Sequence, residues 1–173
     1  FYLRSFYNTY PASEFAEQAA FDEAMCYLKQ SPRYSLEQVS TQKAIEGFQE
    51  FVNKYPKSTK MEQANAKIDE LRGKLRKKEY ENAYLYYKIG QYHAAAEALR
   101  NFLKDFPEYE NPEKINFIIV KALKKYADGS YKTKQEERIK EEQKAYEEFK
   151  AKYPKSEYLA TLDKMQQSYN KKT

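Results

Sequence analysis

The stretch from Arg76 to Pro107, RKKEYENAYLYYKIGQYHAAAEALRNFLKDFP, decides the fold of this chain. Apolar residues recur every three or four positions on both sides of Gly90, which predicts two amphipathic helices joined by a short turn. Glycine tolerates the left-handed backbone found at helix ends, and proline stops a helix because it lacks the amide hydrogen. Two helices of this size cannot bury both apolar stripes alone, so we expect similar pairs stacked beside them.

The composition of the 173-residue chain favours a helical protein. Hydrophobic residues make up 41%, charged residues 33%, and there are four glycines and six prolines, which leaves little material for hairpin turns. The chain has 18 tyrosines, ten phenylalanines and no tryptophan, and tyrosine suits surfaces that are apolar at one end and wet at the other. No apolar run approaches the roughly 18 residues needed to span a bilayer.

Apolar periodicity and capping residues place the helices. We expect them over residues 1–10, 13–29, 38–55, 59–89, 91–106, 111–128 and 134–152, and from 156 to about 169. Ser13, Asn111 and a capping box at Thr59 would start three of them. The apolar stripe changes phase between Leu75 and Tyr80, so the long helix should rotate its contact face near residues 73–78; a break into two helices is the alternative.

The apolar positions expected at the two ends of the chain are Tyr2, Phe6 and Tyr10 at the start and Tyr169 at the end. Phe15 should lie on the apolar side of the second helix. A frayed tail is expected at Lys171-Lys172.

One phrase recurs at four helix ends: YPASEF, YPKSTK, FPEYEN and YPKSEY. An aromatic residue packs under the turn, proline forbids further helix, and serine or asparagine starts the next helix. The prolines lie 45 (56−11), 51 (107−56) and 47 (154−107) residues apart. We therefore expect one all-α superhelical solenoid of helix pairs over residues 1–173, with repeat ends near Pro11, Pro56, Pro107 and Pro154.

These residues resemble the tetratricopeptide repeats. The small, aromatic and proline positions of that pattern are occupied by Ala83, Tyr86, Gly90, Tyr92, Ala95, Leu99 and Pro107. Glu79 departs from the pattern, since the family often has tryptophan there. The order of features along the whole chain is similar to the BamD family of outer-membrane assembly lipoproteins, in a Bacteroidetes-like version.

That resemblance implies a non-catalytic periplasmic adaptor at the outer membrane. It implies partners of two kinds, a BamA-like POTRA domain and unfolded outer-membrane barrel proteins. It also implies that a lipid-bearing cysteine lies upstream of Phe1, so that this chain is N-terminally truncated and meets the membrane through that anchor. Cys26 is not this cysteine, because it lies inside a helix, where we expect it to be a small core residue.

The first helix of each tetratricopeptide pair lines the concave side, and the resemblance places a partner-binding groove there. Its candidate residues are Tyr80, Tyr84, Tyr87 and Lys88 in one repeat, and Phe21, Met25 and Lys29 in an earlier one. Tyrosine beside lysine can lie along an extended peptide and offer a donor to a terminal carboxylate. The competing interpretation of these residues is ordinary packing between repeats.

A basic cluster lies within the long helix, formed by Arg72, Lys74, Arg76, Lys77 and Lys78. A solvated helix face is the simplest explanation. Contact with an acidic partner or anionic headgroups is the alternative. Nucleic acid is disfavoured as a partner, because no interleaved aromatic residues or known reading helix accompany the cluster.

No catalytic or cofactor site is predicted. His93 and Glu97 are one turn apart but lack further metal ligands nearby in the sequence, and the paired glutamates of residues 136–148 alternate with lysine and arginine as on a solvated helix. No glycine-rich phosphate loop or nucleophile elbow is present. The alternative functions are another envelope adaptor of this repeat class, coordinating peptidoglycan or cell division, and an anionic-surface binder acting through the basic cluster.

Overall fold

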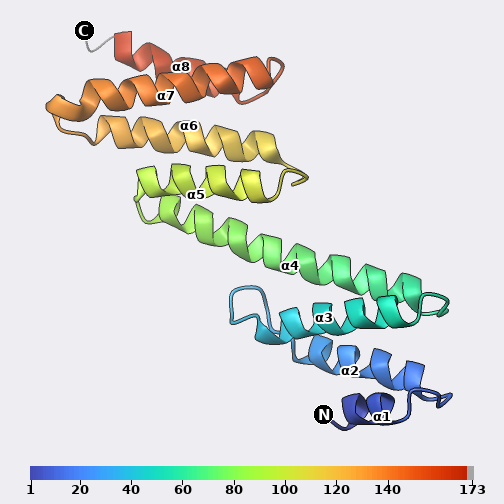
Figure 1. The fold of residues 1–173 in the computed structure, drawn as a ribbon. Helices are drawn as coiled ribbons and strands as arrows, with labels where there is room; N and C mark the ends of the chain where they lie inside the picture. The colour runs from blue at the N-terminus through green and yellow to red at the C-terminus, as the bar shows by residue number, and fades with distance from the viewer. Residues whose placement is uncertain (171–173) are drawn as a thin grey trace. The chain divides into compact units, whose positions relative to one another are not determined.

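The computed structural model describes the backbone of residues 1–170 and the side chains of residues 1–167, and their regular structure is all α-helix (Figure 1). The helices are α1 (Tyr2–Thr9), α2 (Ala16–Gln30), α3 (Val39–Lys54), α4 (Met61–Lys88), α5 (Tyr92–Asp105), α6 (Pro112–Asp128), α7 (Lys132–Lys152) and α8 (Leu159–Asn170). The predicted all-α fold of tetratricopeptide-like helix pairs is confirmed. The expectations for Tyr169 and for Lys171-Lys172 lie outside the described residues.

The four aromatic–proline turns share one backbone geometry. The aromatic residue has φ between −129° and −123° and ψ between 61° and 67°, and its amide donates to the carbonyl four residues earlier at 2.8–2.9 Å. In three of the turns a serine Oγ accepts from the amide two residues later, at 3.0–3.3 Å; these serines are Ser13, Ser58 and Ser156. At the start of α4 the capping hydroxyl is therefore that of Ser58, where the sequence predicted Thr59.

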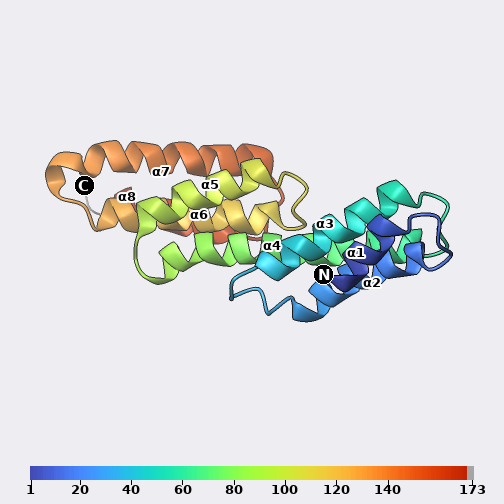
Figure 2. The same cartoon turned by 60° about the horizontal axis from the view of Figure 1, so that its bottom comes forward.

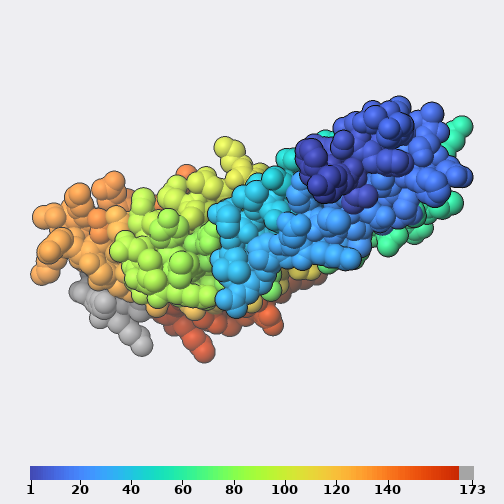
Figure 3. Space-filling model, turned by 90° about the horizontal axis from the view of Figure 1, so that it is seen from below, coloured from blue at the N-terminus to red at the C-terminus, as the bar shows by residue number. Residues whose placement is uncertain are grey.

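Residues Phe1–Lys78 form one compact unit, unit 1, in which α2 packs against both α1 and α3. The close contact of α2 with α3 favours a glycine, since a Cβ built on Gly47 would lie 3.1 Å from the Cβ of Ala24, closer than most such contacts. Glu23 is buried and accepts hydrogen bonds from Arg4 Nε (2.8 Å) and the Tyr7 hydroxyl (2.7 Å). In the space-filling view α1, coloured dark blue, forms part of the surface of this unit (Figure 3).

The second compact unit, unit 2, comprises Glu79–Thr173. Within it α5 packs on α6, α6 packs on α7, and α8 contacts both α6 and α7. Figure 2 shows α5 and α7 along one side and the second half of α4 with α6 along the other. The core is closed by apolar side chains from every one of these helices, among them Ala83, Leu99, Leu123, Phe149 and Leu162.

α4 is continuous from Met61 to Lys88 but serves two different cores. Leu71 is fully buried in the core of unit 1, and Ala83 is buried in the core of unit 2. The change of contact face expected after Leu75 is therefore present, and the alternative of two separate helices is wrong. α4 ends where predicted: Gly90 has φ of +82°, Gln91 N donates to Tyr86 O at 2.9 Å, and Gly90 N donates to Tyr87 O at 3.3 Å, the pattern of a Schellman cap.

Several residues expected on apolar faces or in the core are exposed. Tyr2 and Tyr10 are 85% and 60% exposed, because α1 turns Tyr7 instead toward the core. Phe15 is 63% exposed, since α2 begins one residue after it. Cys26 is also exposed rather than a core residue, because α2 directs its alanines and Phe21 inward.

Charged residues of α7 also differ from expectation. Glu142, predicted to lie on a solvated face, is fully buried, and its Oε1 accepts a hydrogen bond from Gln166 Nε2 at 2.6 Å. The cause is α8, which covers this side of α7. Burial of a carboxylate is tolerated when hydrogen bonds replace those of water.

Candidate partner-binding surface

A row of tyrosines lies along the second half of α4. The rings of Tyr80 and Tyr84 are 5.9 Å apart at an interplanar angle of 4°, and those of Tyr84 and Tyr87 are 5.7 Å apart at 10°. Tyr109 extends the row beyond Tyr80 (5.8 Å between centroids), and Tyr92 meets Tyr87 edge-on (5.7 Å). These five residues, the tyrosine row, are each partly buried against the core of unit 2, so each ring keeps one part open to solvent.

Two lysines lie over the tyrosine row. Lys88 Nζ is 4.9 Å from the ring centroid of Tyr84, and Lys125 Nζ is 5.2 Å and 5.1 Å from those of Tyr87 and Tyr92. Ammonium groups at these distances are attracted to the ring faces. Electrostatic interaction with Tyr87, followed by the effects of Tyr92, raises the pKa of Lys125. The row therefore combines flat apolar faces with positive charge.

The row ends at a small cavity beside Tyr80. Its volume is about 290 Å³, and it is lined by Tyr80, Tyr109, Glu110, Asn111, Lys114 and Ile115. Burial, with smaller effects from Tyr109 and Tyr84, raises the pKa of Tyr80 to about 12. Its hydroxyl, like that of an ordinary tyrosine, is protonated and able to donate a hydrogen bond at physiological pH.

The same combination of residues recurs on the next helix pair. The Phe117 ring of α6 stacks on Tyr158 with centroids 4.4 Å apart, and Lys121 Nζ is 5.1 Å from the Phe117 centroid. Lys121 follows Phe117 by four residues, as Lys88 follows Tyr84. Sequence reasoning missed this second pair, although the aromatic-x-x-x-Lys spacing would have found it. Tyr92, Tyr109 and Lys125 join the surface through tertiary contacts and carry no such local signal.

The candidate groove residues of the earlier repeat, which lies in unit 1, are arranged differently. Phe21 is 5% exposed and packs against Phe48 and Phe51, with ring centroids 5.6 Å and 5.3 Å away. Met25 is partly buried against the same core, and Lys29 is exposed. The structure thus brings the α4 candidates together in a row, and it places Phe21 inside the core of unit 1.

Two lysines of the basic cluster hold the loop of residues 31–38. Lys74 Nζ donates to Ser31 Oγ at 2.7 Å, and Lys78 Nζ donates to the Leu36 carbonyl at 2.8 Å. A loop carbonyl has no helical partner, so an ammonium donor satisfies a group that would otherwise rely on water.

The other cations of the cluster are arranged around the same segment. Lys77 Nζ lies 4.7 Å from the ring centroid of Tyr34, in the same loop. Arg72 is exposed and lines a cavity of about 440 Å³ in unit 1 with Asp69, and Arg76 is partly exposed. Three of the five cations thus contact the loop, which gives the cluster a role inside unit 1.

His93, Glu97 and Glu141 form a group whose potential metal-ligand atoms lie within 4.8 Å of one another. Glu141 comes from α7 and could not be connected with the other two from sequence. Arg100 Nη1 lies 2.6 Å from Glu97 Oε1 and 3.1 Å from Glu141 Oε1. The guanidinium bridges the two carboxylates and offsets part of their repulsion, which accounts for their proximity.

Comparison with known proteins matches residues 1–134 to the model of the YfiO family, described as outer membrane lipoprotein. The chain is also similar to the outer membrane protein assembly factor BamD of Caulobacter vibrioides, with 31% identity over 90 residues. That alignment covers 52% of this chain and 30% of the relative, so the chain spans less than a third of the relative's length. Among the described residues, no helix is both long and apolar enough to cross a bilayer.

Proposed function

The chain belongs to the YfiO family of outer membrane lipoproteins, and from this premise we propose that it is a non-catalytic assembly factor for outer-membrane β-barrel proteins. It would act as a scaffold on the periplasmic face of the outer membrane, held there in the full-length protein by a lipid anchor upstream of Phe1. Its proposed partners are a BamA-like POTRA domain and unfolded barrel proteins.

The observation that carries this proposal is the tyrosine row with Lys88 and Lys125. Stacked tyrosines supply a rigid apolar surface at low entropic cost, and few rotamers are lost when a ligand covers them. An extended barrel segment has alternating apolar side chains, which suit the ring faces, and backbone carbonyls, which suit the tyrosine hydroxyls. Lys125 would attract a terminal carboxylate, whereas the Lys88 ammonium is already 3.3 Å from Glu81 Oε2.

The test is binding of a peptide from the C-terminal end of a barrel protein, measured by fluorescence anisotropy. We expect substitution of Tyr84 and Tyr87 by alanine to weaken binding at least tenfold, because aromatic anchors commonly contribute about 2 kcal/mol or more each. Tyr131 provides the matched control, since it is 88% exposed and lies outside the row. Tyr131→Ala should leave the affinity unchanged.

Two results would reject the tyrosine row as the binding surface. One is unchanged affinity in the double variant with unchanged helicity by circular dichroism. The other is a steep loss of wild-type binding with rising salt, which indicates simple electrostatic attraction rather than contact with the rings. A parallel measurement with a purified POTRA domain tests the second partner in the same way.

A further inference from the structure

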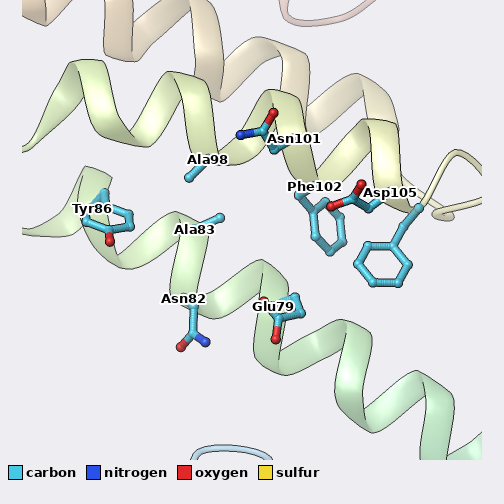
Figure 4. A pocket seen from close by; sticks show the side chains of 9 residues that line it. Glu79, Asn82, Ala83, Tyr86, Ala98, Asn101, Phe102 and Asp105 are labelled. Atoms are coloured by element: carbon cyan, nitrogen blue, oxygen red, sulfur yellow. The ribbon is translucent and has the colours of Figure 1, made fainter.

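A separate cavity lies between α4 and α5 within unit 2 (Figure 4). The Phe102 ring lines it and also contacts Tyr80 of the tyrosine row, with ring centroids 5.8 Å apart. The volume of the cavity is about 540 Å³. Figure 4 shows Ala83 and Ala98 facing each other across the two helices, with the Phe102 ring reaching from α5 toward α4. The small alanine side chains leave the space between the helices open. Glu79, at the position where the repeat pattern often has tryptophan, lines the cavity instead of filling it.

The lining of this cavity is acidic. Glu79 and Asp105 supply two carboxylates, and Asn82 and Asn101 supply two amides. All four residues are exposed, and neither carboxylate takes part in a hydrogen bond or an ion pair within residues 1–167. The chain as a whole carries a net charge of +5, so two carboxylates without a direct ion pair beside one apolar hollow set this cavity apart.

An exposed apolar face continues from the cavity along α4. Tyr86, which lines the cavity, is 44% exposed, and Leu85 and Ile89 are 50% and 61% exposed. Leu85 and Ile89 are four residues apart and therefore neighbours on the helix surface. Glu79 precedes Tyr86 by seven residues, so the acidic end and the apolar end of this face are separated by about 10 Å along the helix axis.

We propose that this surface, the α4–α5 groove, docks a basic amphipathic helix of a partner protein. The apolar stripe of that helix packs on Leu85, Tyr86 and Ile89. An arginine about two turns away reaches Glu79 and Asp105, where a guanidinium can make charge-assisted hydrogen bonds to both carboxylates. Two features select this occupant: carboxylates repel an acidic segment, and the apolar face disfavours a purely polar one.

The groove is distinct from the surface proposed to bind barrel segments. Tyr80, Tyr84 and Tyr87 point to one side of the α5-facing edge of α4, whereas Glu79, Asn82 and Tyr86 point to the other, by helical periodicity. A ligand on either surface leaves the other open, and the docking proposal stands whether or not barrel segments bind the tyrosine row.

The experiment uses the whole chain and a synthetic amidated peptide of about four helical turns, with a leucine stripe at helical spacing and arginines at both ends. Binding is measured by fluorescence anisotropy. Glu79→Gln combined with Asp105→Asn should weaken binding about tenfold, the loss expected for charge-assisted hydrogen bonds. The matched control, Glu136→Gln with Glu137→Gln, removes two exposed carboxylates of α7 outside the groove and should leave the affinity within about twofold.

Further comparisons separate docking from general attraction. A peptide of the same composition, scrambled so that its leucines share no face, should bind at least about tenfold more weakly, since it cannot cover the apolar face. Hydrogen exchange of the complex should show protection in α4 and α5. The proposal is overturned if the control pair loses as much affinity as the groove pair, if the scrambled peptide binds equally well, or if the amphipathic peptide does not bind.

Discussion

Replacement of Gly90 by alanine tests how the α4–α5 turn is held. Gly90 has φ of +82°, and a Cβ built on it meets no heavy atom within 4 Å. The cost of alanine is therefore conformational and not steric. A left-handed L-residue destabilises the folded state by about 1–2 kcal/mol. Alanine also lowers the conformational entropy of the unfolded chain, which offsets about 0.4–1 kcal/mol of this loss. We expect a net loss of about 1 kcal/mol.

Gly73 is the matched control, because it lies in the helical interior of α4 and a Cβ there comes no closer than 4.0 Å to Arg76 Nη2. Gly73→Ala should stabilise the protein by about 1 kcal/mol, the difference in helix propensity between the two residues. Urea denaturation by circular dichroism measures both changes, and hydrogen exchange assigns them to unit 2 and unit 1. Equal changes of the same sign in both variants would refute the assignment of Gly90 to a conformationally demanding cap.

Three further predictions concern stability and local order. Leu99→Ala, at a fully buried position, should lower the free energy of unfolding by about 2–5 kcal/mol. Leu85→Ala, at a half-exposed position, should change it by about 0.5 kcal/mol or less. Similar losses for the two variants in calorimetry would contradict the placement of Leu99 in the core of unit 2. Lys74→Ala with Lys78→Ala should speed hydrogen exchange in residues 31–38, and unchanged exchange would show that the lysines do not hold the loop. The hydrogen bond that the Tyr146 hydroxyl donates to Asp163 raises the pKa of Tyr146 to about 12. The stabilising effect of this bond is complete below pH about 10 and is lost as pH rises through about 12. The urea midpoints of Tyr146→Phe and wild type should therefore converge over that range, and a constant difference would argue against the bond.

Much of the fold could be predicted from local patterns. Gly90 between two periodic runs predicted a helix end and a left-handed glycine, and Asn111 predicted a cap whose side chain does accept from Lys114 N at 3.2 Å. Both features depend on backbone chemistry within a few residues. Phe15 and Tyr10 were expected on apolar helix faces but are exposed, because periodicity fixes which residues share a face but not where the helix begins or which neighbour covers it.

The candidate site was predicted only in part. Tyr84 and Lys88 are four residues apart, so their contact is local and visible in the sequence. Lys125 reaches the same tyrosines from α6, and Tyr109 reaches them from the α5–α6 turn, through the packing of separate helices. Two carboxylates such as Glu79 and Asp105, on different helices, likewise come to line one cavity only when the helices pack.

The sequence by itself determined the helices, their turns and the repeated pairing, because propensity, capping and proline act over a few residues. The tertiary structure decided which aromatic residues became core and which became surface. Phe21 and Tyr84 carry similar local patterns, yet Phe21 is enclosed by α3 whereas Tyr84 stacks in an open row. Burial depends on what a neighbouring helix places opposite each side chain, and that neighbour is distant in the sequence.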